Sequence, residues 1–172
     1  FKPRVNFTTG TTPLAIYMSD LDGDGKSDMV TANQNANTIS VFRNTGTSGT
    51  IDGGSLAAKV DFSVGVQPYF IVMGDVDGDG KPDLIVPNES SGTVSVLRNT
   101  SAVGTLDATS FATKVDFTTG AAPHSVSLQD LDEDGKPEMV IANHNSNTLS
   151  VLKNNSAPGI INASSFAAKI DF

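Results

Sequence analysis

The chain has 172 residues, of which 38% are apolar and 17% charged, a composition typical of a folded protein. No apolar run approaches the roughly 18 to 20 residues of a membrane-spanning helix, and the absence of cysteine excludes disulfides, thiolate metal sites and cysteine nucleophiles. The net charge of −8 is concentrated, because three short segments hold 13 of the 19 acidic residues. A generally acidic surface for a basic partner is therefore not indicated.

The sequence consists of internal repeats with a period of 55 residues and no insertions. Each copy contains F-x-x-G-x-x-P, an Asp-rich segment, an apolar run, a Thr/Ser/Val alternation that ends in Asn, and a Gly/Ser-rich stretch. The chain starts and stops at the same phase of the repeat, as an excerpt from a longer array would. The period is visible in Asp20, Asp75 and Asp130, and in Phe7, Phe62, Phe117 and Phe172.

Within a copy the apolar residues alternate with polar ones, which is the period of a β-strand, and helical spacing is absent. Clusters of Gly, Asn, Asp and Pro separate the runs. The second run is the most continuously apolar and is predicted to be buried on both faces. In the first copy the predicted strands lie near residues 14–19, 28–33, 38–43 and 57–62.

Four short antiparallel strands in such a unit predict one blade of a β-propeller, a fold that closes with about 4 to 8 blades. We therefore expect an all-β chain of three consecutive four-stranded blades, an incomplete propeller or a segment of a longer array. Closure would need more chain, a second molecule, or an open stack in which each unit covers its neighbour. The predicted single repeat domain, 1–172, divides into blades at about 8–62, 63–117 and 118–172, with 1–7 as the outer strand of a preceding or closing blade.

The three Asp-rich segments, 20–28, 75–83 and 130–138, carry carboxylates at their positions 1, 3, 5 and 9. Unit charges about 4 Å apart repel by about 4 kcal/mol per pair at an effective dielectric of about 20, so a cation is expected between them. Oxygen-only ligands favour Ca²⁺ over Zn²⁺, copper or Mg²⁺. The predicted ligands of three Ca²⁺ ions are Asp20, Asp22, Asp24, Lys26 and Asp28, then Asp75, Asp77, Asp79, Lys81 and Asp83, then Asp130, Asp132, Asp134, Lys136 and Glu138, each lysine through its backbone carbonyl.

Two alternatives compete with this interpretation. An EF-hand begins with the same Asp spacing but needs a Glu at position 12, where this chain has Thr31, Val86 and Ile141. Ordinary Asp/Gly turns without an ion are the other alternative, because both residues favour turns. The third segment departs from the pattern at Glu133 and Glu138, which stand in place of Gly and Asp.

F-x-x-G-x-x-P, followed by D-x-D-G-D-G-K-x-D, an apolar strand and N-T-x-S-V, resembles the FG-GAP or VCBS-type repeat of integrin-like and bacterial surface β-propellers. The resemblance covers essentially the whole chain. It implies that the Asp-rich loop joins the first two strands of a blade and binds calcium. It further implies an extracellular, calcium-stabilised binding or scaffold module, without naming a ligand.

Little in the sequence points to other chemistry. The residues repeated outside the Asp-rich segments are Thr, Ser, Asn, Gly and aliphatics, so we expect no enzyme. Neither an aromatic-basic stripe nor a phosphate-binding glycine loop is present, so no nucleic-acid partner is expected. The non-repeating Tyr69, Glu89, His124 and His144 are candidates for a binding face or simply variable exposed positions.

The sequence thus predicts a non-enzymatic, secreted, cell-surface calcium-binding module with a scaffold or adhesion role. It is expected to associate with itself or with neighbouring repeats, forming a closed propeller or a fibre, because three bound Ca²⁺ would leave little net charge. One alternative is a lectin-like propeller that recognises a glycan or a protein. Another is an accessory domain of a secreted enzyme.

Overall fold

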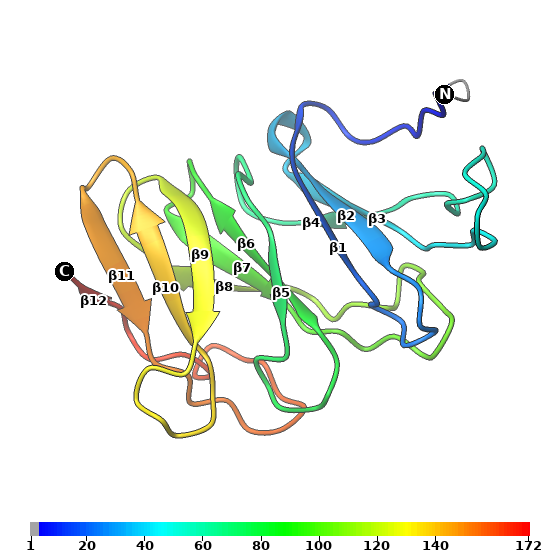
Figure 1. The fold of residues 1–172 in the computed structure, drawn as a ribbon. Helices are drawn as coiled ribbons and strands as arrows, with labels where there is room; N and C mark the ends of the chain where they lie inside the picture. Colours follow the sequence, from blue (N-terminus) through cyan, green and yellow to red (C-terminus); the bar gives the residue numbers. More distant parts are fainter. Residues whose placement is uncertain (1–3) are drawn as a thin grey trace.

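The structure, a computed structural model, describes residues 4–172. Over that range twelve strands form three four-stranded antiparallel sheets, which lie side by side in chain order (Figure 1). We call these sheets blades 1 to 3. Blade 1 comprises β1 (Pro13–Ser19), β2 (Asp28–Asn33), β3 (Thr38–Phe42) and β4 (Val60–Ser63), with a short 3-10 turn, η1 (Gln34–Ala36), between β2 and β3; blade 2 comprises β5 (Val72–Gly74), β6 (Asp83–Asn88), β7 (Thr93–Leu97) and β8 (Val115–Thr118); blade 3 comprises β9 (Pro123–Gln129), β10 (Glu138–Asn143), β11 (Thr148–Leu152) and β12 (Ile170–Asp171).

The strands of every blade pair in chain order, which confirms the predicted all-β fold of three successive four-stranded blades. The first three strands of blade 1 lie where the alternation predicts them. The fourth begins at Val60 rather than near residue 57, because β3 ends at Phe42 and continues only as an isolated bridge between Asn44 and Leu56. The blade limits predicted from the sequence remain predictions.

β5 is shorter than its counterparts β1 and β9. Pro87 stands where blades 1 and 3 have Ala32 and Ala142, and its carbonyl accepts a hydrogen bond from the Tyr69 amide. The nitrogen of Pro87 faces the same neighbouring strand but has no hydrogen to donate. The ladder between β5 and β6 therefore loses one hydrogen bond at a position where β1 is still paired with β2 and β9 with β10.

The second strand of each blade is buried on both faces in blades 1 and 2, as predicted, and nearly so in blade 3. In the central blade, alternate side chains of this strand enter two separate cores. One core lies between blades 1 and 2, and the other lies between blades 2 and 3. Leu84 and Val86 of β6 face blade 1, whereas Ile85 faces blade 3. The hydrophobic effect thus holds blade against blade rather than closing a core within each sheet.

A polar chain of hydrogen bonds crosses each blade at the end of its second strand. In blade 2 the buried Asn88 accepts from the Gly65 amide at 3.0 Å and donates to Ser95, whose hydroxyl donates to Asp116 at 2.6 Å. A Cβ on Gly65 would lie 2.6 Å from the Asn88 side chain. The glycine of F-x-x-G-x-x-P is therefore required by close packing against this asparagine.

The prediction for residues 1–7 is not settled by the fold. Residues 1–3 lie outside the described residues, and residues 4–7 carry no strand assignment. The assignment of 1–7 to the outer strand of another blade therefore remains a prediction. Over residues 4–172, no helix has both the length and the hydrophobicity needed to cross a bilayer.

Candidate metal centres

The three Asp-rich segments form equivalent loops, one in each blade. Loop 1 (20–28) joins β1 to β2, loop 2 (75–83) joins β5 to β6, and loop 3 (130–138) joins β9 to β10. Each loop therefore connects the first two strands of its blade, as the resemblance implies. All three lie at the same end of the blades, because the strand order is the same in each.

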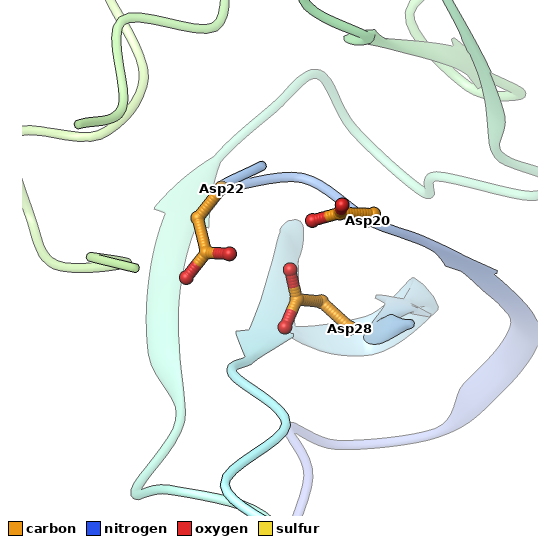
Figure 2. A group of neighbouring side chains, drawn as sticks. All are labelled: Asp20, Asp22 and Asp28. Atoms are coloured by element: carbon orange, nitrogen blue, oxygen red, sulfur yellow. The ribbon is translucent and has the colours of Figure 1, made fainter. Parts of the chain in front are cut away.

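Each loop gathers three carboxylates around one point. In loop 1 these are Asp20, Asp22 and Asp28, whose side chains converge across the turn (Figure 2). One oxygen from each lies within 4.8 Å of the others, and the same holds in loops 2 and 3. The equivalent groups are Asp75, Asp77 and Asp83, and Asp130, Asp132 and Glu138.

The loop backbone folds around the first carboxylate. In loop 1 the Asp24 and Gly25 amides donate to the two oxygens of Asp20, at 3.2 and 2.8 Å. The chain can turn this sharply because Gly25 adopts a φ of +84°, in the left-handed region that glycine enters without steric cost. Gly80 and Gly135 do the same in loops 2 and 3.

The carboxylate at position 9 ties the loop to the segment that follows the third strand of its own blade. Both oxygens of Asp83 accept backbone hydrogen bonds, from Val76 at 3.1 Å and from Asn99 at 2.8 Å. Glu138 takes the same two roles in loop 3, accepting from Leu131 and Asn154. The extra methylene of Glu138 is thus accommodated, and the third cluster keeps its three carboxylates.

Burial makes these carboxylates unfavourable as bare anions. It raises the pKa of the Asp83 carboxyl to about 7, outweighing the amide hydrogen bonds from Asn99 and Val76 that lower it. Burial likewise raises the pKa of Asp28 and of Asp77, and nearby carboxylates add to both effects. Like charges in a low-dielectric environment repel one another, and binding a proton or a cation relieves that repulsion.

One carboxylate oxygen of loop 2 lacks a hydrogen-bond partner in the described part of the chain. Asp77 Oδ2 is buried and has no hydrogen-bond partner among the described residues. An unpaired buried carboxylate oxygen is costly unless a positive group lies against it. The residue Asp77 belongs to the same cluster as Asp75 and Asp83. The residues present therefore suit a hard, oxygen-seeking ion, and the three clusters could each hold a metal ion.

The structure does not gather every predicted ligand. The carboxylate at position 5 lies outside each three-carboxylate group. In loop 1 the Oδ1 of this residue, Asp24, accepts from the Lys26 amide at 2.9 Å, and Asp79 and Asp134 make the same turn. Coordination by position 5 and by the lysine carbonyl at position 7 remains a prediction.

Each cluster also has a basic side chain beside it, which the sequence did not predict. Arg43 Nε donates to Asp22 at 2.9 Å, Arg98 lies 3.5 Å from Asp79, and Lys153 pairs with Asp132. These three residues follow the third strand of their blades and are themselves 55 residues apart. That in-register recurrence of positive charge was the signal that could have found them.

The loops also contact the next blade along the chain. We call residues 99–111 and 154–166 the second and third capping segments, and residues 44–56 the first. Asn99 Nδ2 donates to the Leu21 carbonyl of loop 1 at 2.8 Å, and the Ser101 hydroxyl donates to the same carbonyl at 3.0 Å. Asn154 and Ser156 bind the Val76 carbonyl of loop 2 in the same way.

Comparison with protein families agrees with this geometry. The FG-GAP-like repeat matches residues 20–86 and again residues 75–141, so each match starts at the first Asp of a loop. The two matches cover 20–141, well over half of the chain. The chain belongs to the FG-GAP-like repeat family. Comparison with curated proteins finds no match.

The opposite end of the FG-GAP-like repeats carries a second group of side chains. The His124 ring stacks on Tyr69 of the previous blade, with centroids 4.1 Å apart, and on His144, at 4.6 Å. Glu89 lies 3.6 Å from His124 Nε2, which is buried and makes no hydrogen bond among the described residues. The four non-repeating residues singled out from the sequence therefore meet between blades 2 and 3.

Proposed function

We propose that this FG-GAP-like chain is a non-enzymatic, calcium-binding structural module of the extracellular space. The observation that carries the proposal is the triple recurrence of a three-carboxylate cluster, with an unpaired buried oxygen at Asp77. An ion at each cluster would supply the positive charge that the carboxylates lack. The chain itself supplies the loop geometry and the contacts between blades.

Calcium suits the sites better than other ions do. Over the described residues the clusters contain carboxylates and neither His nor Cys, which favours a hard cation and disfavours Zn²⁺ or copper. Ca²⁺ accepts irregular oxygen cages, whereas Mg²⁺ demands an octahedron and keeps its waters. We place the module outside the cell, where sites as weak as about 10⁻⁴ to 10⁻³ M are sufficient.

Binding at these loops would stabilise more than a turn. Loop 1 is held at its Leu21 carbonyl by Asn99 and Ser101 of the next blade. The same loop is tied to the segment after its own third strand through Asp28, which accepts from the Asn44 amide at 2.8 Å. Ordering the loop therefore fixes one blade internally and against its neighbour, as a scaffold requires.

The test is calcium binding measured by isothermal titration calorimetry, with thermal melts in millimolar Ca²⁺ and in excess chelator. We expect up to three ions per chain and a higher melting temperature in calcium. The variant Asp77→Asn should lose one site. The matched control Asp107→Asn changes an exposed aspartate outside the clusters and should keep all of the sites. Unchanged melting in chelator would overturn the structural role.

A second candidate function is recognition of a glycan or a protein at the ring stack. The favouring observation is that Tyr69, His124 and His144 stack between blades, beside Glu89. Exposed aromatic faces next to a carboxylate can bind sugar rings or peptide side chains. Glycan-array binding that disappears in Tyr69→Ala and His144→Ala, with unchanged melting, would support it. Identical binding by both variants would exclude the stack as the binding site.

A further inference from the structure

The second capping segment is anchored to loop 2, the acidic loop of its own blade. The Asn99 amide donates to Asp83 Oδ1 at 2.8 Å, and Asp83 is a member of the second cluster. Asn99 Nδ2 donates to the Pro82 carbonyl at 3.0 Å, and Lys81 Nζ donates to the Ser101 carbonyl at 2.7 Å. Three residues at the end of loop 2 therefore set the position of the start of this segment.

The same segment also covers loop 1 of the preceding blade. The Asn99 side chain and the Ser101 hydroxyl donate to the Leu21 carbonyl, and the Gly104 amide donates to the Asp22 carbonyl at 3.0 Å. Asp22 is a member of the first cluster. Asn99 thus forms a bridge between the two loops, with hydrogen bonds to a cluster carboxylate of loop 2 and to the backbone beside a cluster carboxylate of loop 1.

This bridge is closed to solvent. Leu21, Asn99 and Ser101 are 1%, 0% and 5% exposed. A buried carbonyl that loses its donors is costly, because water does not reach it to replace them. The order of the loop 1 backbone therefore depends on the position of Asn99, which loop 2 sets.

An equivalent bridge joins loops 2 and 3. The Asn154 amide donates to the Glu138 carboxylate at 3.3 Å, and Asn154 Nδ2 donates to the Val76 carbonyl of loop 2 at 2.9 Å. The Gly159 amide donates to the Asp77 carbonyl at 3.2 Å. Loop 2 therefore takes part in both bridges, as the anchor of the first and as the covered loop of the second.

We propose that these bridges couple the ion sites, so that an ion in one loop raises the affinity of the adjacent loop. The proposal rests on the calcium-binding function proposed above and describes how its sites act on one another. Fixing Asp83 with an ion also fixes Asn99, and with it the Leu21 carbonyl. Loop 1 then loses less conformational entropy when it binds its own ion. Because such coupling is reciprocal, an ion in loop 1 favours binding in loop 2 by the same factor.

The position of loop 2 in both bridges distinguishes this coupling from other sources of cooperativity. If calcium simply folded the whole chain, the loss of any one site would weaken the other two alike. Coupling through the bridges predicts instead that loss of the loop 2 site uncouples both remaining sites. Loss of the loop 1 site or of the loop 3 site leaves one coupled pair.

The experiment is a calcium titration of the full chain, followed by calorimetry and by the backbone amide NMR signals of one glycine in each loop, Gly25, Gly80 and Gly135. We expect three ions and positive cooperativity. Asp75→Asn removes a carboxylate of the loop 2 cluster and should leave two ions that bind independently and about five- to tenfold more weakly. The matched variants Asp20→Asn and Asp130→Asn, at the same loop position, should each leave two ions that still bind cooperatively.

A milder change tests the bridge itself. Ser101→Ala removes the hydroxyl bond to the Leu21 carbonyl but keeps the anchor to loop 2, which uses the Ser101 carbonyl. Blade 1 has Gly46 at this position, so the turn forms without a hydroxyl. We expect ion binding in loop 1 to weaken about two- to tenfold, and by less in the Asp75→Asn background, where the coupling is already lost. Ser156→Ala is the matched control and should act on loop 2 more than on loop 1, because its hydroxyl donates to loop 2.

Three ions that bind independently in the unaltered chain would overturn the coupling and leave the proposed function standing. Equal weakening by all three loop variants would overturn the bridges as the route of the cooperativity. Absence of calcium binding would overturn the proposed function together with the coupling. Circular dichroism in chelator verifies that each variant keeps its strands.

Discussion

Asn99 lies one blade away from Leu21, yet its side-chain amide donates to the Leu21 carbonyl at 2.8 Å, in the middle of an acidic loop. Asn154 binds Val76 at 2.9 Å in the same way. The loops are therefore shared between neighbouring blades. An ion held in a loop and the contact between two blades should stabilise each other, because both order the same backbone.

The first prediction concerns this contact. Asn99→Ala removes donors to the Leu21 and Pro82 carbonyls and leaves the buried carbonyl of Leu21 with only Ser101. We expect a loss of about 1 to 3 kcal/mol in the free energy of unfolding, measured by urea denaturation in dilute solution. Asn44→Ala is the matched control, because over the described residues Asn44 donates within blade 1 only, to Ser27. Equal losses in both variants would count against a contribution from the contact between blades.

The second prediction is a pH dependence of the calcium-free protein. The pKa of Asp83 is raised by burial to about 7, so the folded state holds a proton that the unfolded state releases at about pH 4. This contribution to stability is complete below about pH 4 and is lost as the pH rises to about 7. Asp28 and Asp77, whose pKa values are also raised by burial, act in the same direction. The melting temperature in chelator should therefore fall between about pH 4 and pH 7.

The calcium-bound protein is the control for that titration. A cation competes with the proton for the same carboxylates, so the rise in melting temperature caused by calcium should grow over the same pH range. The carboxyls of Asp61 and Asp171 have lowered pKa values and lose their stabilising effect only under more acidic conditions. A calcium-free melting temperature that rose from about pH 4 to about pH 7 would contradict the prediction.

The third prediction concerns Glu133 in loop 3. This residue has a φ of +61°, where Gly23 and Gly78 have +70° in loops 1 and 2. The left-handed conformation costs an L-residue about 1 to 2 kcal/mol, partly offset by the flexibility of glycine in the unfolded chain. Glu133→Gly should therefore raise the free energy of unfolding by up to about 1 kcal/mol.

The reciprocal substitution isolates the backbone effect. A Cβ on Gly78 would meet no atom within 4 Å, so Gly78→Ala should destabilise through conformation alone, by about 1 kcal/mol. The free energy of unfolding of both variants is measured by chemical denaturation in calcium and in chelator. If Glu133→Gly destabilised the chain, Glu133 would have to make a contact that outweighs its strained backbone.

Much of the fold could be predicted because the same sequence pattern occurs in three copies. Alternation of apolar residues places strands such as β2 and β3, and the Asp spacing places positions 1, 3 and 9 of each loop around one point. These are local relationships, fixed by a few neighbouring residues. The same local reasoning did not show that Asp24 turns toward the Lys26 amide, since several acceptors compete inside one short loop.

Relationships between blades were harder to predict. Tyr69 and His144 flank His124 only because the starts of β5 and β9 and the end of β10 meet at one end of the sheets. Within blade 1, the pairing of Arg43 with Asp22 likewise joins the residue after β3 to the loop between β1 and β2. Sequence spacing identifies such residues when they recur, but strand order and blade packing decide which of them touch.

The final prediction concerns the glycine of F-x-x-G-x-x-P, where a local motif and a long-range contact coincide. A Cβ on Gly65 would lie 2.6 Å from the Asn88 side chain, which is buried and hydrogen-bonded to the Gly65 amide and to Ser95. Gly65→Ala must displace that asparagine and should cost about 1 to 3 kcal/mol. Gly53→Ala is the matched control, because no atom lies within 4 Å of its Cβ position. Thermal and urea denaturation of both variants measure the difference, and comparable stabilities would mean that the asparagine is free to move and does not hold the blade together.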